Sequence, residues 1–289
     1  MSENRDMALT PHVGSTLATS SRRSWTTTRD WTLEHTGIEP TGCFAAPSAT
    51  PRLERNEVQV WLGNLHQGPE RIEAFLRTLS HDEQERASRF RFGRDRVRFI
   101  AARGILRRLL GVYLGTASER VSFQYNEYGK PSLSGEFSSA CIRFNVSHSA
   151  ARVLLAFSIG REVGVDIEEV RPDLATEGIA EKYFSPFEVN ALRSLPKNLR
   201  TEAFFNCWTR KEAYIKAEGD GLSRPLDEFD VSLAPGEPAC LLETRVRERP
   251  ASAWTLLSLD AGRGYKAALV CEGRDWRPTC WRWPDNGWI

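Results

Sequence analysis

The order in which the spacing of apolar residues changes along this chain is the feature that most limits its fold. Residues 57–62 alternate apolar with polar side chains, as a strand does. Helical spacing follows, then a group of short strand-like runs, and the order of strand, helices and strands occurs once more. This repeat predicts an α+β protein of two similar halves that meet near residues 159–163, and a ligand between such halves would be an ordinary arrangement.

Two capping boxes mark helix starts. Ser80 and Glu83 stand three residues apart, and Ser185 and Glu188 repeat the pattern with Pro186 at the first helical position. In a capping box the serine and glutamate side chains each accept a hydrogen bond from an otherwise unpaired backbone N–H. Longer helices are expected over residues 95–114 and 201–217, the second ending at Gly219.

The other apolar runs are short and lie between turn residues, which is typical of strands. They cover residues 121–125, 142–147, 152–159, 163–169, 229–233, 241–246, 254–259 and 265–271.

Residues 1–55 differ from the rest in composition. They are rich in serine and threonine, contain four prolines and show no sustained apolar period. Such a segment buries too little apolar surface to offset the entropy lost on ordering. We expect a disordered or variable N-terminal tail over residues 1–55, an N-terminal half over 56–160 and a C-terminal half over 161–289.

The composition is that of a soluble globular protein. The chain is 40% hydrophobic and 27% charged, with a net charge of +1. No apolar run approaches the roughly 18 residues of a membrane helix, and the N-terminus lacks the pattern of a secretory signal. None of the six cysteines has the spacing of a zinc site. We therefore expect reduced cysteines, a cytoplasmic location and no membrane contact.

Two carboxylates lie on one face of a predicted strand. Within residues 163–169, Asp166 and Glu168 point the same way, roughly 7 Å apart, and Gly164 leaves space on that face. Adjacent carboxylates repel each other unless a cation or another partner lies between them. This pattern favours a cation site.

A third carboxylate and a lysine lie on a predicted helix. Trp208, Glu212 and Lys216 are spaced by four residues and share one face. A glutamate and a lysine in this order also form an ordinary surface pair worth about 0.2–0.5 kcal/mol. The tryptophan on the same face argues against a fully solvated position. Oxygen ligands from a strand and a helix suit Mg²⁺.

Ser147 and His148 are adjacent in a predicted strand, which raises the possibility of a hydrolase. Neighbours on a strand face opposite sides, so they do not form a nucleophile–base pair.

Between Arg86 and Arg108 the chain has nine arginines and a single acid. Such a stretch can be a solvated helical face, a nucleic-acid contact or a phosphate site. The tryptophans at 276, 281, 283 and 288 either cover an exposed edge or form a partner surface, and the pattern leaves both open.

Five short motifs occur in one order and at plausible separations. Together they resemble the 4′-phosphopantetheinyl transferases of the longer, pseudo-dimeric, surfactin-synthetase-activating type, over most of residues 57–270. The motifs are Tyr128-Gly129-Lys130-Pro131, Phe144-Asn145-Val146-Ser147-His148-Ser149, Gly164-Val165-Asp166-Ile167-Glu168, Phe184-Ser185-Pro186-Phe187-Glu188, and residues 208–216.

The resemblance implies a reaction and its partners. Enzymes of this family transfer the 4′-phosphopantetheine arm of coenzyme A to a serine of an apo-carrier protein (an acyl, peptidyl or aryl carrier domain) and release 3′,5′-ADP. It implies two similar α+β halves related by pseudo-twofold symmetry, with the active site in the cleft between them. It also implies coenzyme A and a small acidic carrier domain as partners, with Mg²⁺ as cofactor. We expect a monomer that contacts no nucleic acid.

The same resemblance implies roles for particular residues. Asp166, Glu168 and Glu212 would be the metal ligands, and Glu212, Lys216 and Asp166 the catalytic group. The residues expected to bind coenzyme A are Arg86, Arg98, Lys130, Ser147, His148 and Lys216.

One position departs from the family pattern. Glu83 stands where a phosphate-binding lysine can occur, and a carboxylate there would repel the 3′-phosphate unless it points away. Its capping-box role gives it a reason to do so.

Two alternatives remain from the residues alone. A metal-dependent phosphodiesterase or nuclease would use the same carboxylates and arginines, but it does not account for the Gly-Lys-Pro and Ser-His motifs in this order. A catalytically inactive protein that binds carrier domains is the other.

Overall fold

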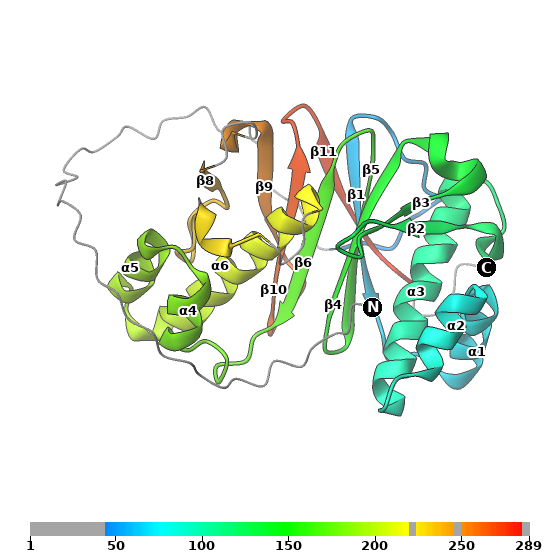
Figure 1. The fold of residues 1–289 in the computed structure, drawn as a ribbon, viewed down its shortest axis with the longest axis horizontal. Helices are drawn as coiled ribbons and strands as arrows, with labels where there is room; N and C mark the ends of the chain where they lie inside the picture. The colour runs from blue at the N-terminus through cyan, green and yellow to red at the C-terminus, as the bar shows by residue number, and fades with distance from the viewer. Residues whose placement is uncertain (1–43, 220–223, 246–249, 285–289) are drawn as a thin grey trace. The chain divides into compact units, whose positions relative to one another are not determined.

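This computed structural model describes residues 44–219, 224–245 and 250–284 (Figure 1). All of them belong to one compact unit, Glu39–Ile289. The predicted tail over residues 1–55 therefore lies outside the described residues as far as position 43, and so does Trp288.

The described elements follow the order expected from the apolar spacing. The first group comprises β1 (Glu57–Asn64), α1 (Pro69–Thr78), α2 (His81–Ser88), α3 (Gly93–Leu114), β2 (Phe123–Tyr125), β3 (Pro131–Leu133), β4 (Ile142–Ser149) and β5 (Arg152–Ile159). The second group comprises β6 (Val163–Glu169), α4 (Glu177–Tyr183), α5 (Pro186–Ser194), α6 (Lys197–Glu218), β7 (Phe229–Val231), β8 (Leu241–Thr244), β9 (Trp254–Leu259), β10 (Tyr265–Glu272) and β11 (Arg277–Arg282). Short 3₁₀ segments at Ser118–Arg120, Gly135–Ala140, Leu226–Glu228 and Ala251–Ala253 connect some of them.

Two sheets form the centre of the fold, with helices on the outer face of each (Figure 1). One sheet has the strand order β11-β1-β5-β4, and the other has the order β6-β10-β9. Helices α1, α2 and α3 cover the first sheet, and α4, α5 and α6 cover the second. A separate apolar cluster lies between the sheets and takes residues from both, among them Val60, Leu154, Val165 and Leu269. The α+β prediction is confirmed.

The local helix signals are confirmed. Ser80 N donates to Glu83 Oε2 at 3.1 Å, and Ser185 N donates to Glu188 Oε2 at 2.9 Å, so both capping boxes form. Helix α6 ends at Gly219, whose φ of 87° is in the left-handed region that glycine adopts without strain.

Some strand predictions were wrong in extent. The predicted strand over residues 121–125 begins only at Phe123, where β2 pairs with the unpredicted β3. β7 ends at Val231 and β8 at Thr244, both before the predicted bounds. These pieces form two-stranded hairpins, in which pairing ends where the partner strand ends.

Strand β11 was not predicted at all. It runs parallel to β1, with Trp281 opposite Trp61. Trp281 and Trp283 each pack on the Trp61 ring at 6.2 Å between ring centroids. Trp276 is buried between the sheets and donates its indole N–H to Gly273 O at 3.1 Å. Trp281 and Trp283 therefore cover the edge beside β1, Trp276 fills the space between the sheets, and none of the three forms an open surface.

None of the helices in the three described ranges is long and apolar enough to cross a membrane. The five cysteines in the same ranges are free thiols, as expected, and Cys43 lies outside them.

Helix α6 lies directly on β6, because Gly164 has no side chain. A methyl group at Gly164 would lie 2.1 Å from the Ala213 carbonyl oxygen and 2.4 Å from the Ala217 nitrogen. Both atoms belong to the helix backbone and cannot rotate away. The space that Gly164 was expected to leave is thus filled by the helix that carries Glu212 and Lys216.

We predict that Gly164→Ala destabilises the protein by about 1–3 kcal/mol, because the helix must move off the strand. Chemical denaturation would measure the change. Gly178→Ala is the matched control: Gly178 lies in α4, and a methyl group there meets no atom within 4 Å. Equal stability of the two variants would contradict the close packing of α6 on β6.

Candidate active site

Strands β4 and β6 and helix α6 bring three of the expected residues into direct contact. Ser147 Oγ donates to Asp166 Oδ1 at 2.8 Å. Lys216 Nζ donates to the same Asp166 oxygen at 2.5 Å and to Ser147 Oγ at 3.1 Å. The two edge strands are also joined by Asn145, whose Oδ1 accepts from Val165 N at 3.0 Å. This arrangement places the group where the two sheets meet.

Glu168 and Glu212 lie beside this group. Glu168 is on the same face of β6 as Asp166, as predicted, and accepts from Ser149 Oγ at 2.8 Å. Glu212 is buried one turn before Lys216 on α6 and interacts electrostatically with Asp166 and Lys216. Ser147 is buried and His148 is solvent-accessible, so the two neighbours face opposite sides of β4, as expected.

Burial and the neighbouring charges shift the pKa values of the residues in this group. Burial, followed by the charge of Asp166, raises the pKa of Glu168 to about 7. Burial raises the pKa of Glu212 to about 7 as well; Lys216 opposes this shift and Asp166 adds to it. Burial opposes the charge on Lys216, but the nearby carboxylates outweigh it and raise the Lys216 pKa. One lysine therefore does not neutralise the three carboxylates.

The residue types fit a divalent cation. Asp166 Oδ2 is buried and has no hydrogen-bond partner among the described residues, which is costly for a carboxylate. Two further carboxylates repel it, so a cation would relieve both penalties. In the part of the chain that the structure describes, no three His, Cys, Asp or Glu side chains are gathered closely enough to hold a metal ion. Lys216 Nζ is paired with the other Asp166 oxygen, Oδ1. The lysine would have to move partly away for a cation to bind that oxygen as well.

His148 and Arg98 lie near the same group. Partial removal of the ring from water lowers the His148 pKa, and the positive charges of Lys216 and Arg98 lower it further. The Arg98 guanidinium approaches Asp95 only at 4.0 Å, and its buried Nε has no partner among the described residues. A guanidinium without a close carboxylate partner is a suitable donor to a phosphate.

Arg86 and Lys130 lie apart from the Asp166 group. Arg86 is exposed on α2, and its guanidinium lies over the Phe99 ring at 5.3 Å from the centroid. Lys130 pairs with Glu162 at 3.0 Å, beside the C-terminal end of α6. Neither residue has a contact with Asp166, Glu168 or Glu212 in the described structure.

Glu83 points into the interior of the protein. Its side chain is buried, where it pairs with Arg107 at 2.6 Å and with Arg103 at 3.3 Å. The capping box was predicted from local spacing, but the two arginines were not. They come from the next helix, and no local pattern links them to Glu83.

Sequence reasoning missed two other polar residues around the site. Ser149 holds Glu168, and Glu162 holds Lys130. Ser149 lies two residues after Ser147 on β4 and therefore faces the same side of the strand, so the alternation of β4 contained a signal for Ser149. Glu162 is a lone acid in a turn, where the sequence has no distinguishing signal.

Comparison with known proteins identifies the family. The model of the 4′-phosphopantetheinyl transferase superfamily matches residues 162–270, and that of the 4′-phosphopantetheinyl transferase N-terminal domain matches residues 66–159. With the relative described next, these matches show that the chain belongs to the 4′-phosphopantetheinyl transferase family.

One relative is similar over nearly its whole length. The 4′-phosphopantetheinyl transferase HetI of Nostoc sp. is 41% identical over 231 residues, which cover 80% of this chain and 94% of that protein. The 4′-phosphopantetheinyl transferase Sfp of Bacillus subtilis is 34% identical over 164 residues, 57% of this chain and 70% of Sfp. The L-aminoadipate-semialdehyde dehydrogenase-phosphopantetheinyl transferase of Xenopus laevis is 32% identical over 169 residues, 55% of each protein.

Proposed function

We propose that this chain transfers the 4′-phosphopantetheine arm of coenzyme A to a serine of an apo-carrier protein. The serine oxygen forms a bond to the β-phosphorus of coenzyme A, the bond to the bridging pyrophosphate oxygen breaks, and 3′,5′-ADP leaves. The family and the relatives support this reaction class. The observation that carries the proposal is the contact of Ser147, Asp166 and Lys216 between the two sheets, with two further carboxylates beside it.

Glu212 is the base in this proposal. In the metal-free protein, burial raises its pKa to about 7, and a carboxylate placed beside the attacking serine is a suitable proton acceptor. It would take the proton from the carrier serine as the serine attacks. Lys216 keeps its positive charge, because neighbouring carboxylates raise its pKa, and it would stabilise negative charge on the transferring phosphate.

Asp166, Glu168 and Glu212 would hold a divalent cation, which we propose to be Mg²⁺, after their side chains and that of Lys216 have moved from the positions described above. Oxygen ligands and substrate phosphates are the donors that Mg²⁺ prefers. The cation would offset the charge of the pyrophosphate when bound. The buried Asp166 Oδ2, which has no hydrogen-bond partner in the described part of the chain, supports this assignment.

We assign the phosphates of coenzyme A to basic residues of the N-terminal half. The Arg98 guanidinium, which approaches Asp95 only at 4.0 Å, and the solvent-accessible His148 ring near it support donation to phosphate oxygens. Arg86, Lys130 and Ser147 complete the set. The C-terminal half supplies the carboxylates and Lys216, so we propose a functional division near residue 160.

We also propose that the chain acts as a monomer in the cytoplasm. Both sets of site residues come from one chain, and the free thiols are consistent with a reducing compartment.

The test is release of 3′,5′-ADP from coenzyme A, followed by chromatography, after addition of an apo-carrier. We expect release that depends on Mg²⁺ and is lost when the carrier serine is replaced by alanine. Release that continues with the alanine carrier would indicate a phosphodiesterase and overturn the proposal.

A further inference from the structure

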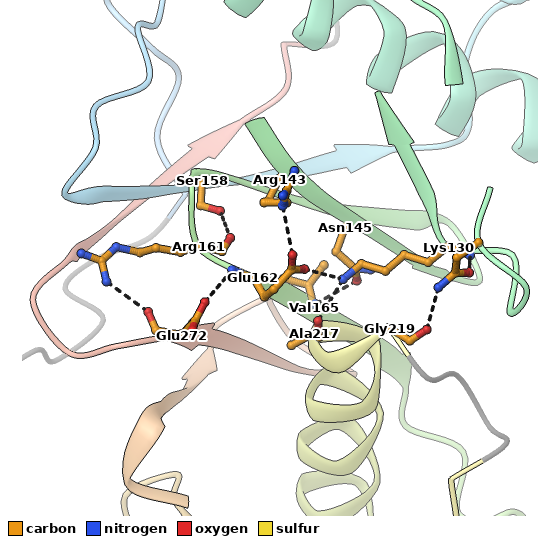
Figure 2. Close-up of polar contacts among 11 residues, drawn as sticks. Lys130, Arg143, Asn145, Ser158, Arg161, Glu162, Val165, Ala217, Gly219 and Glu272 are labelled. Atoms are coloured by element: carbon orange, nitrogen blue, oxygen red, sulfur yellow. Dashed lines mark hydrogen bonds and ion pairs between the residues drawn. The ribbon is translucent and has the colours of Figure 1, made fainter. Parts of the chain in front are cut away.

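A second polar group lies where the N-terminal half meets the C-terminal end of α6 (Figure 2). Its centre is the Glu162 carboxylate, in the turn between β5 and β6. Lys130 Nζ donates to Glu162 Oε2 at 3.0 Å, and Arg143 Nε donates to Glu162 Oε1 at 2.9 Å. Each oxygen of the Glu162 carboxylate thus accepts from one basic side chain. Lys130 lies in the turn just before β3, and Arg143 lies on β4.

The same lysine is bonded to α6. Lys130 Nζ also donates to the Ala217 carbonyl oxygen at 2.9 Å, and Asn126 Nδ2 donates to Gly219 O at 2.9 Å. The last carbonyls of a helix lack partners within it and have partial negative charge, so a cation there is favourable. Two side chains of the β2–β3 hairpin therefore fix it to the end of the helix that carries Glu212 and Lys216.

The turn that presents Glu162 is itself held. Glu162 N donates to Glu272 Oε2 at 3.4 Å, and Arg161 donates to the Glu272 carbonyl oxygen at 3.3 Å (Figure 2). Ser158 Oγ donates to Arg161 O at 2.6 Å. The Glu162 carboxylate is thus presented from a turn anchored to β10 and β5.

Lys130 remains able to bind a ligand while it is held. An ammonium has three N–H donors, and two of those of Lys130 are used by Glu162 and Ala217. The third has no partner among the described residues and could donate to a phosphate oxygen. The Lys130 side chain is only 18% exposed, whereas that of Glu162 is 39% exposed.

We propose that Glu162 is a positioning residue for coenzyme A. It holds the Lys130 ammonium against the end of α6 and so sets the distance between the phosphate-binding hairpin and the catalytic helix. A lysine without this anchor samples many rotamers and loses that freedom on binding phosphate, which weakens binding. In the described structure the partners of Glu162 are Lys130, Arg143 and Glu272, none of which is a proposed metal ligand. This inference rests on the proposed function.

The test measures coenzyme A binding by calorimetry, with Mg²⁺ and without carrier, together with the kcat and KM of transfer. We expect Glu162→Ala to raise the Kd and KM for coenzyme A about tenfold, the usual size of one charge-assisted hydrogen bond. The kcat should change less than about twofold, because the transition-state contacts of Glu212 and Lys216 are kept. Glu162→Gln, whose amide oxygen still accepts a hydrogen bond, should raise the Kd by about threefold.

Two controls isolate the role of Glu162. Glu136→Ala removes an exposed ion pair of the same length, with Arg120 at 2.9 Å, and should leave the Kd unchanged. In a Lys130→Ala background, Glu162→Ala should add less than about a twofold effect, because the two residues act as one unit.

Several results would overturn the proposal. Unchanged or tighter binding of coenzyme A by Glu162→Ala would do so, as would a tenfold effect that persists without Lys130, or a loss of kcat at constant KM. If the wild-type protein binds coenzyme A and Glu162→Ala binds it equally well, only the positioning role fails. If the wild type binds no coenzyme A, the proposed function fails with it.

Discussion

Glu212→Gln is expected to lower the kcat of phosphopantetheine transfer by about 10²–10⁴-fold, the usual contribution of a general base, while the protein stays folded. The amide has nearly the same shape, but it neither accepts the proton of the carrier serine nor ligates a cation as a carboxylate does. Turnover at saturating coenzyme A and Mg²⁺ would measure the loss.

The stability of the same variant should depend on pH in a defined direction. Folding raises the Glu212 pKa from 4.5 to about 7, so the ionised carboxylate opposes folding. This penalty is absent below pH 4.5, grows as the pH rises and is complete above about pH 7. In EDTA, Glu212→Gln should therefore match the wild-type Tm at pH 4 and exceed it at pH 8.

The matched control is Glu202→Gln, ten residues earlier on α6. Glu202 is partly exposed and pairs with Lys266 on the surface of the protein. This variant should keep full activity. Activity of Glu212→Gln near that of the control would remove Glu212 from the catalytic group.

Lys211→Met is expected to destabilise the protein by about 3–5 kcal/mol, the usual cost of leaving one partner of a buried ion pair alone. The Lys211 and Glu188 side chains are both fully buried, 2.8 Å apart. Lys211 Nζ also donates to the Leu226 and Phe229 carbonyl oxygens, both at 2.6 Å. Methionine would leave the Glu188 charge and two carbonyls without this partner. Unfolding in guanidinium chloride would measure the change.

An exposed pair on the same helix supplies the comparison. Lys266→Met breaks the Lys266–Glu202 pair, whose side chains are 31% and 43% exposed. It should cost no more than about 1 kcal/mol. If Lys211→Met cost no more than this control, the buried pair would not be what holds α6 against α5 and β7.

Local signals predicted the elements well, because their causes are local. Capping boxes at Ser80 and Ser185 and the stop at Gly219 each depend on residues within one turn. Strand β11 was missed because its partner, β1, lies more than 200 residues earlier, and a parallel pair has no turn to mark it.

The candidate site was predicted from a family resemblance, and its internal contacts were not. Asp166 and Lys216 were both named, but their ion pair arises from α6 lying on β6 at Gly164. The ion pairs of Arg107 and Glu162 could not be predicted from the sequence for the same reason. Each finds its partner through tertiary packing, Arg107 with Glu83 and Glu162 with Lys130, so the spacing of charges along the chain does not reveal them.

The intact mass of a purified apo-carrier is the most direct test of the central claim. The carrier would be incubated with this protein, coenzyme A and Mg²⁺, with EDTA as the control. Our account predicts a mass gain of one phosphopantetheine arm that is absent with EDTA and with Asp166→Ala. An unchanged mass on fatty-acid, peptide and polyketide carriers alike would contradict it.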